Sequence, residues 1–264
     1  MLSFLNNLVF TLVYPWPLVI VVAIVALVCL AALKAGGLDF SGACFAFILG
    51  TGTLWITRFE GLAVFSAFYV SSTLISSAGK ASRVKKHGAR NWKQVIANGL
   101  MAFLGVLIYG FTGNFAYLVM FAASVAEANS DTWAGETGRL SRQNPVSILT
   151  LRPVNRGLSG GVTVLGFAGG FAGSLLIAVL FLLLFCSSFT QCAVVVASGF
   201  TGCVLDSVLG ASVQALYYDE KNGVYTEDPS FEHVRGLKWM DNSMVNLLSN
   251  IFSAVLAIGL CMFI

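Results

Sequence analysis

The segment from Ala126 to Gly138, AEANSDTWAGETG, places three carboxylates at the end of an apolar run that begins near Phe115. Glu127 and Asp131 are four residues apart, so on a helix they share one face, and Glu136 follows five residues later. Acids inside a membrane are costly and normally face a cavity or a partner. Carboxylate oxygens suit Mg²⁺, which commonly shares its shell with water and phosphate. We therefore predict Mg²⁺ binding by these three acids.

Small and polar residues interrupt the apolar pattern of the same segment, namely Asn129, Ser130, Thr132 and Gly135. Such interruptions inside a span are typical of a discontinuous helix whose freed backbone groups line a site. We therefore expect the helix that starts near Phe115 to fray or break within this segment.

Two further acids belong to other apolar runs. Asp206 lies near the middle of GFTGCVLDSVLGASVQAL, where Gly210 and Gln214 would share its helical face. Asp241 heads the segment KWMDNSMVNLLSN, in which amides recur every four residues and form a polar stripe, at Asn242, Asn246 and Asn250. A purely structural interpretation is that these acids and amides only form hydrogen bonds inside a helix bundle. We favour a lined site at Asp206 and Asp241.

A basic, glycine-containing segment follows the acidic one. Arg152 and Arg156 precede GLSGGV, in which Gly157, Gly160 and Gly161 would stand where a helix begins. Backbone N–H groups and the positive helix end could then hold phosphate, with the two arginines as a clamp. The segment is not a Walker A loop, since the GK[ST] ending is missing. The later pairs of glycines with four-residue spacing indicate close helix packing, at Gly166 with Gly170 and Gly169 with Gly173.

Amide side chains are further candidates for the predicted phosphate site. Asn98, in QVIANGL, lies near the cytoplasmic end of a predicted span, where it could also serve as interhelical glue. The predicted phosphate- and nucleotide-binding residues are Arg152, Arg156, Gly157, Gly160, Gly161, Asn242, Asn246 and Asn98. The loop GKASRVKKHGARNWK, residues 79–93, has six cations and no acid, which suits either topology or an anion-facing surface.

Composition identifies an integral membrane protein. The chain is 57% hydrophobic and 10% charged, whereas an average soluble domain is about 25% charged. The pattern predicts a single all-α membrane domain over residues 1–264, a polytopic helix bundle of about eight transmembrane helices. The expected spans are residues 14–33, 38–57, 59–79, 94–112, 114–136, 158–186, 190–217 and 241–264.

The positions of the basic residues predict the orientation. With eight spans, 14 of the 15 Lys and Arg residues fall in four loops on one side, and only Arg58 lies on the other. The positive-inside rule places those loops in the cytoplasm and both termini outside, and we expect a bacterial inner membrane. The net charge of +3 says little about nucleic acid, because the basic loops could serve topology, anionic lipid or a phosphorylated substrate, and no nucleic acid is expected as a partner. The six cysteines lack metal-binding spacing and are expected to pack in the core.

Five motifs occur in order across residues 90–250: QVIANG, AEANSDTWAGETG, RGLSGGV, GFTGCVLDSVLGASVQ and WMDNSMVN. Together they resemble the integral membrane family that includes plant phytyl-phosphate kinase. That family is similar, more distantly, to phytol kinase, dolichol kinase and phosphatidate cytidylyltransferase. The resemblance implies a helical bundle with a cytoplasm-facing active site that uses a nucleoside triphosphate, often CTP, with Mg²⁺.

The resemblance also implies roles for particular residues. Asp131 and Glu136 belong to the DTWAxExG motif and Asp206 to DSxLGA, and DNxxVN supplies Asp241, Asn242 and Asn246. The chain departs from the expected pattern at Asn129, Leu158 and Asn155. These departures bear on the substrate more than on the chemistry.

The resulting hypothesis is a kinase that uses CTP or ATP to convert an isoprenyl monophosphate, such as phytyl phosphate, to the diphosphate beside membrane lipid. Asp131, Asp206 and Asp241 would hold Mg²⁺ on the triphosphate, and Arg152 and Arg156 would neutralise the transferred phosphoryl group. Two alternatives remain open. One is cytidylyl transfer to a lipid phosphate, and the other is a cation-coupled lipid or solute transporter using Glu127, Asp131 and Asp206.

Overall fold

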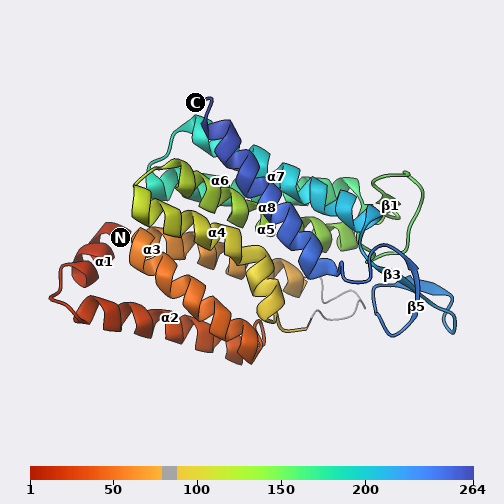
Figure 1. The fold of residues 1–264 in the computed structure, drawn as a ribbon, viewed down its shortest axis with the longest axis horizontal. Helices are drawn as coiled ribbons and strands as arrows, with labels where there is room; N and C mark the ends of the chain where they lie inside the picture. The colour runs from red at the N-terminus through yellow and green to blue at the C-terminus, as the bar shows by residue number, and fades with distance from the viewer. Residues whose placement is uncertain (79–87) are drawn as a thin grey trace.

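The computed structural model of the protein describes residues 1–78 and 88–264, and these residues are mostly helical. Figure 1 shows long helices running roughly along one direction, with both chain termini at one end and the strands at the other. We call the second end the loop end, because residues 141–163 and 213–241 lie there. The helices are α1 (Leu2–Phe10), α2 (Trp16–Lys34), α3 (Phe40–Ala78), α4 (Trp92–Thr112), α5 (Ala116–Leu140), α6 (Val164–Phe185), α7 (Phe189–Ser212) and α8 (Asn242–Cys261).

Six helices in the described residues are long and apolar enough to cross a membrane: α2, α3, α4, α6, α7 and α8. The predicted membrane helix bundle is confirmed at this level. Most of the predicted basic loop, residues 79–87, lies outside the part of the chain that the structure describes.

Helix α3 reverses direction at Arg58, whose backbone has φ 60° and ψ −157°. A Cβ on Gly61 would lie only 3.0 Å from Cγ2 of Thr53. In a continuous helix, residues eight apart are separated by about 12 Å along the axis. The two legs of α3 therefore lie side by side, at the positions of the spans predicted over 38–57 and 59–79.

The short helix α1, which the sequence analysis did not predict, packs against the residues at which α3 reverses direction. The Asn6 amide donates to both carboxylate oxygens of Glu60, at 2.7 and 3.0 Å, and its oxygen accepts from the Phe59 backbone N–H at 3.2 Å. The Arg58 guanidinium lies 3.8 Å from the centre of the Phe10 ring. Arg58 is the one basic residue that was predicted on the same side as the termini, and its charge is packed against α1.

Helix α5 occupies the centre of the bundle and contacts α3, α4, α6, α7 and α8. It is continuous through Leu140, so the predicted break is wrong. The polar residues are satisfied without unwinding, because Asn129 Nδ2 donates to Gly173 O at 2.8 Å and Ser130 Oγ donates to Gly170 O at 2.8 Å. Side chains thus reach the carbonyl groups of α6 while α5 keeps its own backbone hydrogen bonds.

The predicted glycine packing surface on α6 is confirmed. A Cβ on Gly173 would lie 3.0 Å from Asn129 O, and one on Gly166 would lie 3.0 Å from Ala134 O. The interface between α5 and α6 is the most extensive one between elements of the described structure. Without Cβ atoms on this face, the two backbones approach closely enough for the side chain to carbonyl bonds just described.

Short strands at the loop end correct the all-α prediction. Strands β1 (Val146–Ser147) and β2 (Gly161–Val162) form one antiparallel pair. A second antiparallel sheet has the order β4-β3-β5, from β3 (Leu216–Asp219), β4 (Val224–Thr226) and β5 (Glu232–Arg235). Helix α7 accordingly ends at Ser212, not at the predicted residue 217, because the LYYD segment pairs with two later strands.

The close approach of α4 to α5 gives a test of this packing. A Cβ on Gly105 would lie 2.7 Å from Tyr117 O and 3.0 Å from Phe121 N, which are backbone atoms that cannot move aside. We expect Gly105→Ala to lower the free energy of unfolding by about 1–3 kcal/mol, the usual cost of overpacking. Thermal unfolding of the purified protein in one detergent would measure this.

The matched control is Gly259→Ala on α8, where a Cβ would meet nothing within 4 Å. Alanine has the better helix propensity, so this variant should unfold at the same temperature or higher. A Gly105→Ala protein as stable as the Gly259→Ala protein would contradict the packing of α4 on α5.

Candidate active site

Two buried acids from different helices meet at one hydroxyl group. Ser249 Oγ on α8 lies 2.7 Å from Glu127 Oε1 on α5 and 3.2 Å from Asp206 Oδ2 on α7. Glu127 is 1% exposed and Asp206 is 7% exposed. Gly202 allows the approach, because a Cβ there would lie 2.6 Å from Glu127 Cγ. A hydroxyl has one proton to donate, so it can satisfy only one carboxylate at a time.

The second oxygen of Glu127 is held by the predicted amide stripe. Asn250 Nδ2 donates to Glu127 Oε2 at 2.7 Å and to Ser124 O at 2.9 Å. The Asn250 oxygen accepts from Ser124 Oγ at 2.6 Å. The carboxylate deepest in the cluster is therefore fixed in orientation by α5 and α8 together.

The acids of this cluster form no salt bridge in the described structure, although the charge of Arg139 acts on Asp131. Asp131, one helical turn after Glu127, is close enough for its charge to act on Asp206. Within residues 1–78 and 88–264, no Lys or Arg forms a salt bridge with Glu127, Asp131 or Asp206. Mutual repulsion of buried carboxylates favours a bound cation, and their oxygens are the ligands that Mg²⁺ prefers.

A complete metal site is not formed by acids alone. Among the residues that the structure describes, no group of three or more His, Cys, Asp or Glu side chains could hold a metal ion. Mg²⁺ usually keeps several waters and takes one or two carboxylates together with substrate phosphates. Asp131 and Asp206 fit this pattern, so these two residues would hold the ion if phosphate oxygens and water completed its shell.

Glu136 faces a different neighbour from the other acids of α5. Its Oε1 accepts from Ser76 Oγ of α3 at 3.0 Å and from Arg139 at 3.3 Å. Glu136 is five residues after Asp131, so the two side chains point in directions about 140° apart around the helix axis. The structure therefore directs Glu136 towards α3 and does not bring it to the Ser249 cluster.

Asp241 stands at the mouth of the bundle, not in the cluster. It caps the N-terminus of α8, with its Oδ1 accepting from Met244 N at 2.9 Å, and its side chain is exposed. Eight residues of helix separate it from Ser249, which is about 12 Å along the axis. The predicted set of Asp131, Asp206 and Asp241 is thus spread along a path from the mouth inward.

Asparagine side chains occupy the space between the mouth and the cluster. Asn246 Nδ2 donates to Asn98 Oδ1 of α4 at 3.3 Å. With the amide turned over, its nitrogen would instead donate to Asp206 Oδ2 at 3.2 Å and to Asn242 O at 2.7 Å. Asn242 Oδ1 accepts from Ser159 Oγ at 3.5 Å. The predicted amides Asn98, Asn242 and Asn246 therefore lie together beside Asp206.

The glycine segment rests on the end of α7. Gly160 has φ 77°, and a Cβ on it would overlap Ala211, while a Cβ on Gly210 would lie 2.9 Å from Ser159 Cβ. Helix α6 begins later, at Val164 after the Thr163 cap. The expectation that Gly157, Gly160 and Gly161 begin a helix is therefore wrong, because positive φ at 157 and 160 and the pairing of 161 in β2 make this segment a loop.

The two predicted arginines differ in what they contact. The Arg156 guanidinium donates to the carbonyl oxygens of Ser141, Arg142 and Gln143, at 2.9, 3.3 and 3.2 Å, so it fixes the loop onto the end of α5. The side chain of Arg152 is exposed. Arg156 is exposed as well, so the two differ in that carbonyl oxygens hold the Arg156 guanidinium, whereas the Arg152 guanidinium forms no hydrogen bond within the described residues.

Three residues of this site were missed by the sequence analysis: Ser249, Ser159 and Glu227. Glu227 Oε1 accepts from Ser159 N at 2.8 Å and ties the end of β4 to the glycine loop. Its charge also acts on Asp206. Glu227 stands in a polar segment without periodicity, so the sequence contained no indication of its role. Ser249 directly precedes Asn250 of the predicted asparagine stripe, and this position was the only indication of its role in the sequence.

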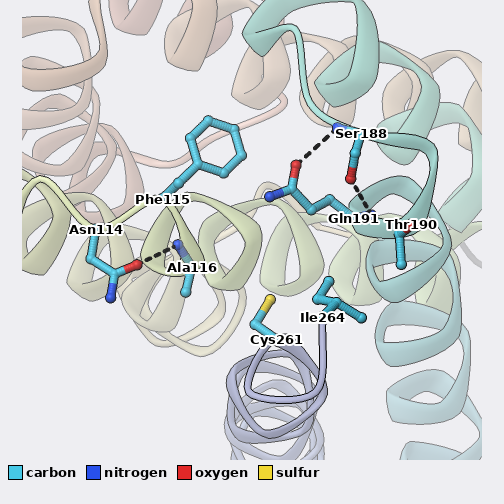
Figure 2. Close-up of a pocket in the computed structure, with 8 residues that line it drawn as sticks. All are labelled: Asn114, Phe115, Ala116, Ser188, Thr190, Gln191, Cys261 and Ile264. Carbon is cyan, nitrogen blue, oxygen red and sulfur yellow. Dashed lines mark hydrogen bonds between the residues drawn. The ribbon is translucent and has the colours of Figure 1, made fainter.

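A hollow at the other end of the described structure contributes nothing to this cluster. Figure 2 shows a hollow of about 270 Å³ between helix ends at the terminal side of the bundle. Its polar groups cap helices, since Asn114 Oδ1 accepts from Ala116 N at 3.0 Å and Ser188 and Gln191 form a capping box. The lining residues are Asn114, Phe115, Ala116, Ser188, Thr190, Gln191, Cys261 and Ile264.

Fold and site together define an integral membrane helix bundle with an acidic site near one end. The chain belongs to the DUF92 family of integral membrane proteins, whose model matches residues 23–254. It is 30% identical to Protein PGR of Arabidopsis thaliana, over 90% of this chain and 94% of that protein. An uncharacterized membrane protein of Methanocaldococcus jannaschii is 29% identical, over 89% of this chain and 91% of its own length.

A more distant relative is Protein VTE6, chloroplastic, of Arabidopsis thaliana, which is 24% identical over 86% of this chain and 66% of its own length. The resemblance to the family of plant phytyl-phosphate kinase is thus confirmed at the level of the family. No solved structure matches the chain.

The hydrogen bonds of Asn250 give a test of the cluster. Asn250→Ala removes the donor to Glu127 and both contacts to Ser124, so a buried carboxylate loses a partner. We expect a loss of about 3 kcal/mol in the free energy of unfolding, the upper range for an unsatisfied buried group. Chemical denaturation in detergent would measure this.

Ser253→Ala on the same helix is the control, because that buried hydroxyl donates only to Ala123 O at 3.1 Å. Its loss should cost about 1 kcal/mol. Equal stability of the two variants would argue against Glu127 being held by Asn250.

Proposed function

We propose that the protein is a Mg²⁺-dependent kinase that transfers the γ-phosphoryl group of CTP or ATP to an isoprenyl monophosphate, giving the diphosphate. The observation that carries the proposal is the buried acidic cluster at Ser249, which forms no salt bridge within the described residues and lies next to a glycine loop. The relationship to VTE6 and the motif resemblance to phytyl-phosphate kinase support the same reaction.

The proposed topology has eight crossings. The two legs of α3 count as two, and α5 crosses as well, although its polar residues lower its hydropathy. An even number agrees with both termini lying at one end of the bundle in Figure 1. The arginines at 139, 142, 152 and 156 lie at the loop end, so the positive-inside rule makes this end cytoplasmic.

The triphosphate would enter from the loop end. Asp131 and Asp206 would bind Mg²⁺, which when bound would neutralise charge on the transferred phosphoryl group. The Asn242 and Asn246 amides would orient phosphate oxygens above Asp206. Asp241 at the mouth and the exposed Arg152 would contact the outer part of the nucleotide, whereas Arg156 would maintain the loop.

The chemistry needs little proton transfer. An oxygen of the acceptor phosphate attacks the γ-phosphorus, the bond from that phosphorus to the bridging oxygen breaks, and the nucleoside diphosphate leaves. Because the acceptor is already an oxyanion, no base must remove a proton. Positioning and charge neutralisation would therefore provide most of the catalysis.

Replacing one carboxylate tests the assignment. We expect Asp206→Asn to reduce turnover by about 10²–10³-fold, the typical effect of losing one preorganised electrostatic group. The assay uses purified protein, Mg²⁺, CTP or ATP and a short isoprenyl monophosphate, with products identified by mass. Omission of Mg²⁺ should abolish turnover by the unchanged protein.

Asp39→Asn is the matched control, since Asp39 caps the start of α3 through Ser41 Oγ and Gly42 N, and asparagine caps helices equally well. It should retain full turnover. Undiminished turnover by Asp206→Asn would refute the role of Asp206.

The same assay separates the alternatives. Cytidylyl transfer would release pyrophosphate and leave a nucleotide-linked lipid. The depth of Glu127, which is 1% exposed inside the bundle, also suits a cation-coupled transporter. Transport would require the substrate to cross sealed vesicles without nucleotide consumption.

A further inference from the structure

We propose that the three-stranded sheet β4-β3-β5 binds the base of the nucleoside triphosphate and prefers bases with an exocyclic amino group. This inference rests on the proposed function. A hollow of about 510 Å³ on the sheet is lined by Tyr218, Gly223, Tyr225, Glu232, His233 and Val234. That volume falls within the range of about 300–1,000 Å³ that is usual for small-molecule sites.

The register of the sheet places two aromatic rings and one carboxylate on the same face. Tyr218 of β3 stands opposite Tyr225 of β4 and opposite Glu232 of β5. Directly opposite residues project to the same side of a sheet. The rings of Tyr218 and Tyr225 are 5.2 Å apart between centres, and Tyr225 remains 47% exposed.

This face of the sheet is the one available to a ligand. Tyr217, the neighbour of Tyr218 in β3, projects to the other side and is 6% exposed. Its ring packs against His233, with 5.4 Å between ring centres. One face of the sheet is therefore buried at Tyr217 and the other presents aromatic rings, as surfaces that stack nucleobases do.

The carboxylate accounts for selectivity. Glu232 is exposed, and an ionised carboxylate only accepts hydrogen bonds. It can accept from the amino group of cytosine or adenine. Uracil presents a carbonyl oxygen at the corresponding edge and would be repelled.

The sheet is continuous with the proposed phosphate site. Glu227, two residues after Tyr225, accepts from Ser159 N of the glycine loop at 2.8 Å. The next residue of that loop, Gly160, packs against Ala211 on the helix that carries Asp206. A nucleotide with its base on Tyr225 would thus extend its phosphates towards the loop and the acids. The hollow in Figure 2 lies at the opposite end of the bundle and has no such connection.

The test compares nucleotide binding with inorganic triphosphate binding. Purified full-length protein in detergent is titrated with CTP, ATP, UTP and tripolyphosphate, each with Mg²⁺, by calorimetry. We expect Tyr225→Ala to weaken CTP and ATP binding about tenfold, which is about 1.4 kcal/mol, and to leave tripolyphosphate binding unchanged. Tyr225→Phe keeps the ring and should bind as the wild type does.

Phe231→Ala is the control, because Phe231 is a partly exposed aromatic residue of the same segment that does not line the hollow. It should bind all four ligands normally. Glu232→Gln can donate as well as accept, so it should reduce the preference for CTP and ATP over UTP from about tenfold to less than about threefold.

The outcomes distinguish this inference from the proposed function. A wild-type protein that binds no nucleotide would overturn both. Tight nucleotide binding that is unchanged in Tyr225→Ala would overturn only the base site, as would an equal loss of CTP and tripolyphosphate binding. Equal wild-type affinity for CTP, ATP and UTP would overturn the role of Glu232.

Discussion

The sharing of one hydroxyl by two buried carboxylates is the constraint on which the rest of the bundle depends. Glu127 and Asp206 would repel each other if both were ionised. They remain side by side because α8 supplies Ser249 to both and Asn250 to Glu127, and because Gly202 lets α5 and α7 approach. The three helices must therefore keep one register.

The central position of α5 follows from the same requirement. A helix that carries Glu127, Asn129, Ser130 and Asp131 cannot face lipid, so other helices surround it. Its polar side chains form hydrogen bonds with neighbouring helices, namely with carbonyl oxygens of α6 and with hydroxyls of α3. The glycines of α6 make those bonds short enough to form. The small residues of α6 therefore allow polar residues on α5, because they let the two backbones approach within hydrogen-bonding distance of those side chains.

The loop end adds parts that the helices lack. Arg156 binds three carbonyl oxygens and gives the glycine loop a fixed place on α5, and Glu227 fastens the sheet to that loop. The glycine loop, the aromatic sheet and the acidic cluster are thus linked by a continuous series of contacts. In the proposed function, a nucleotide would span this series.

The sequence by itself determined the membrane class and the approximate positions of the long helices, because hydropathy is a property of local segments, but it missed the short helix α1. It also indicated the glycine packing of α6. Only the tertiary structure decided that α5 stays continuous, that Glu136 turns to α3 and that Ser249 joins Glu127 to Asp206. It alone revealed the sheet formed by residues 216–235. Each of these features depends on hydrogen-bond partners far away in the chain, which a local pattern cannot supply.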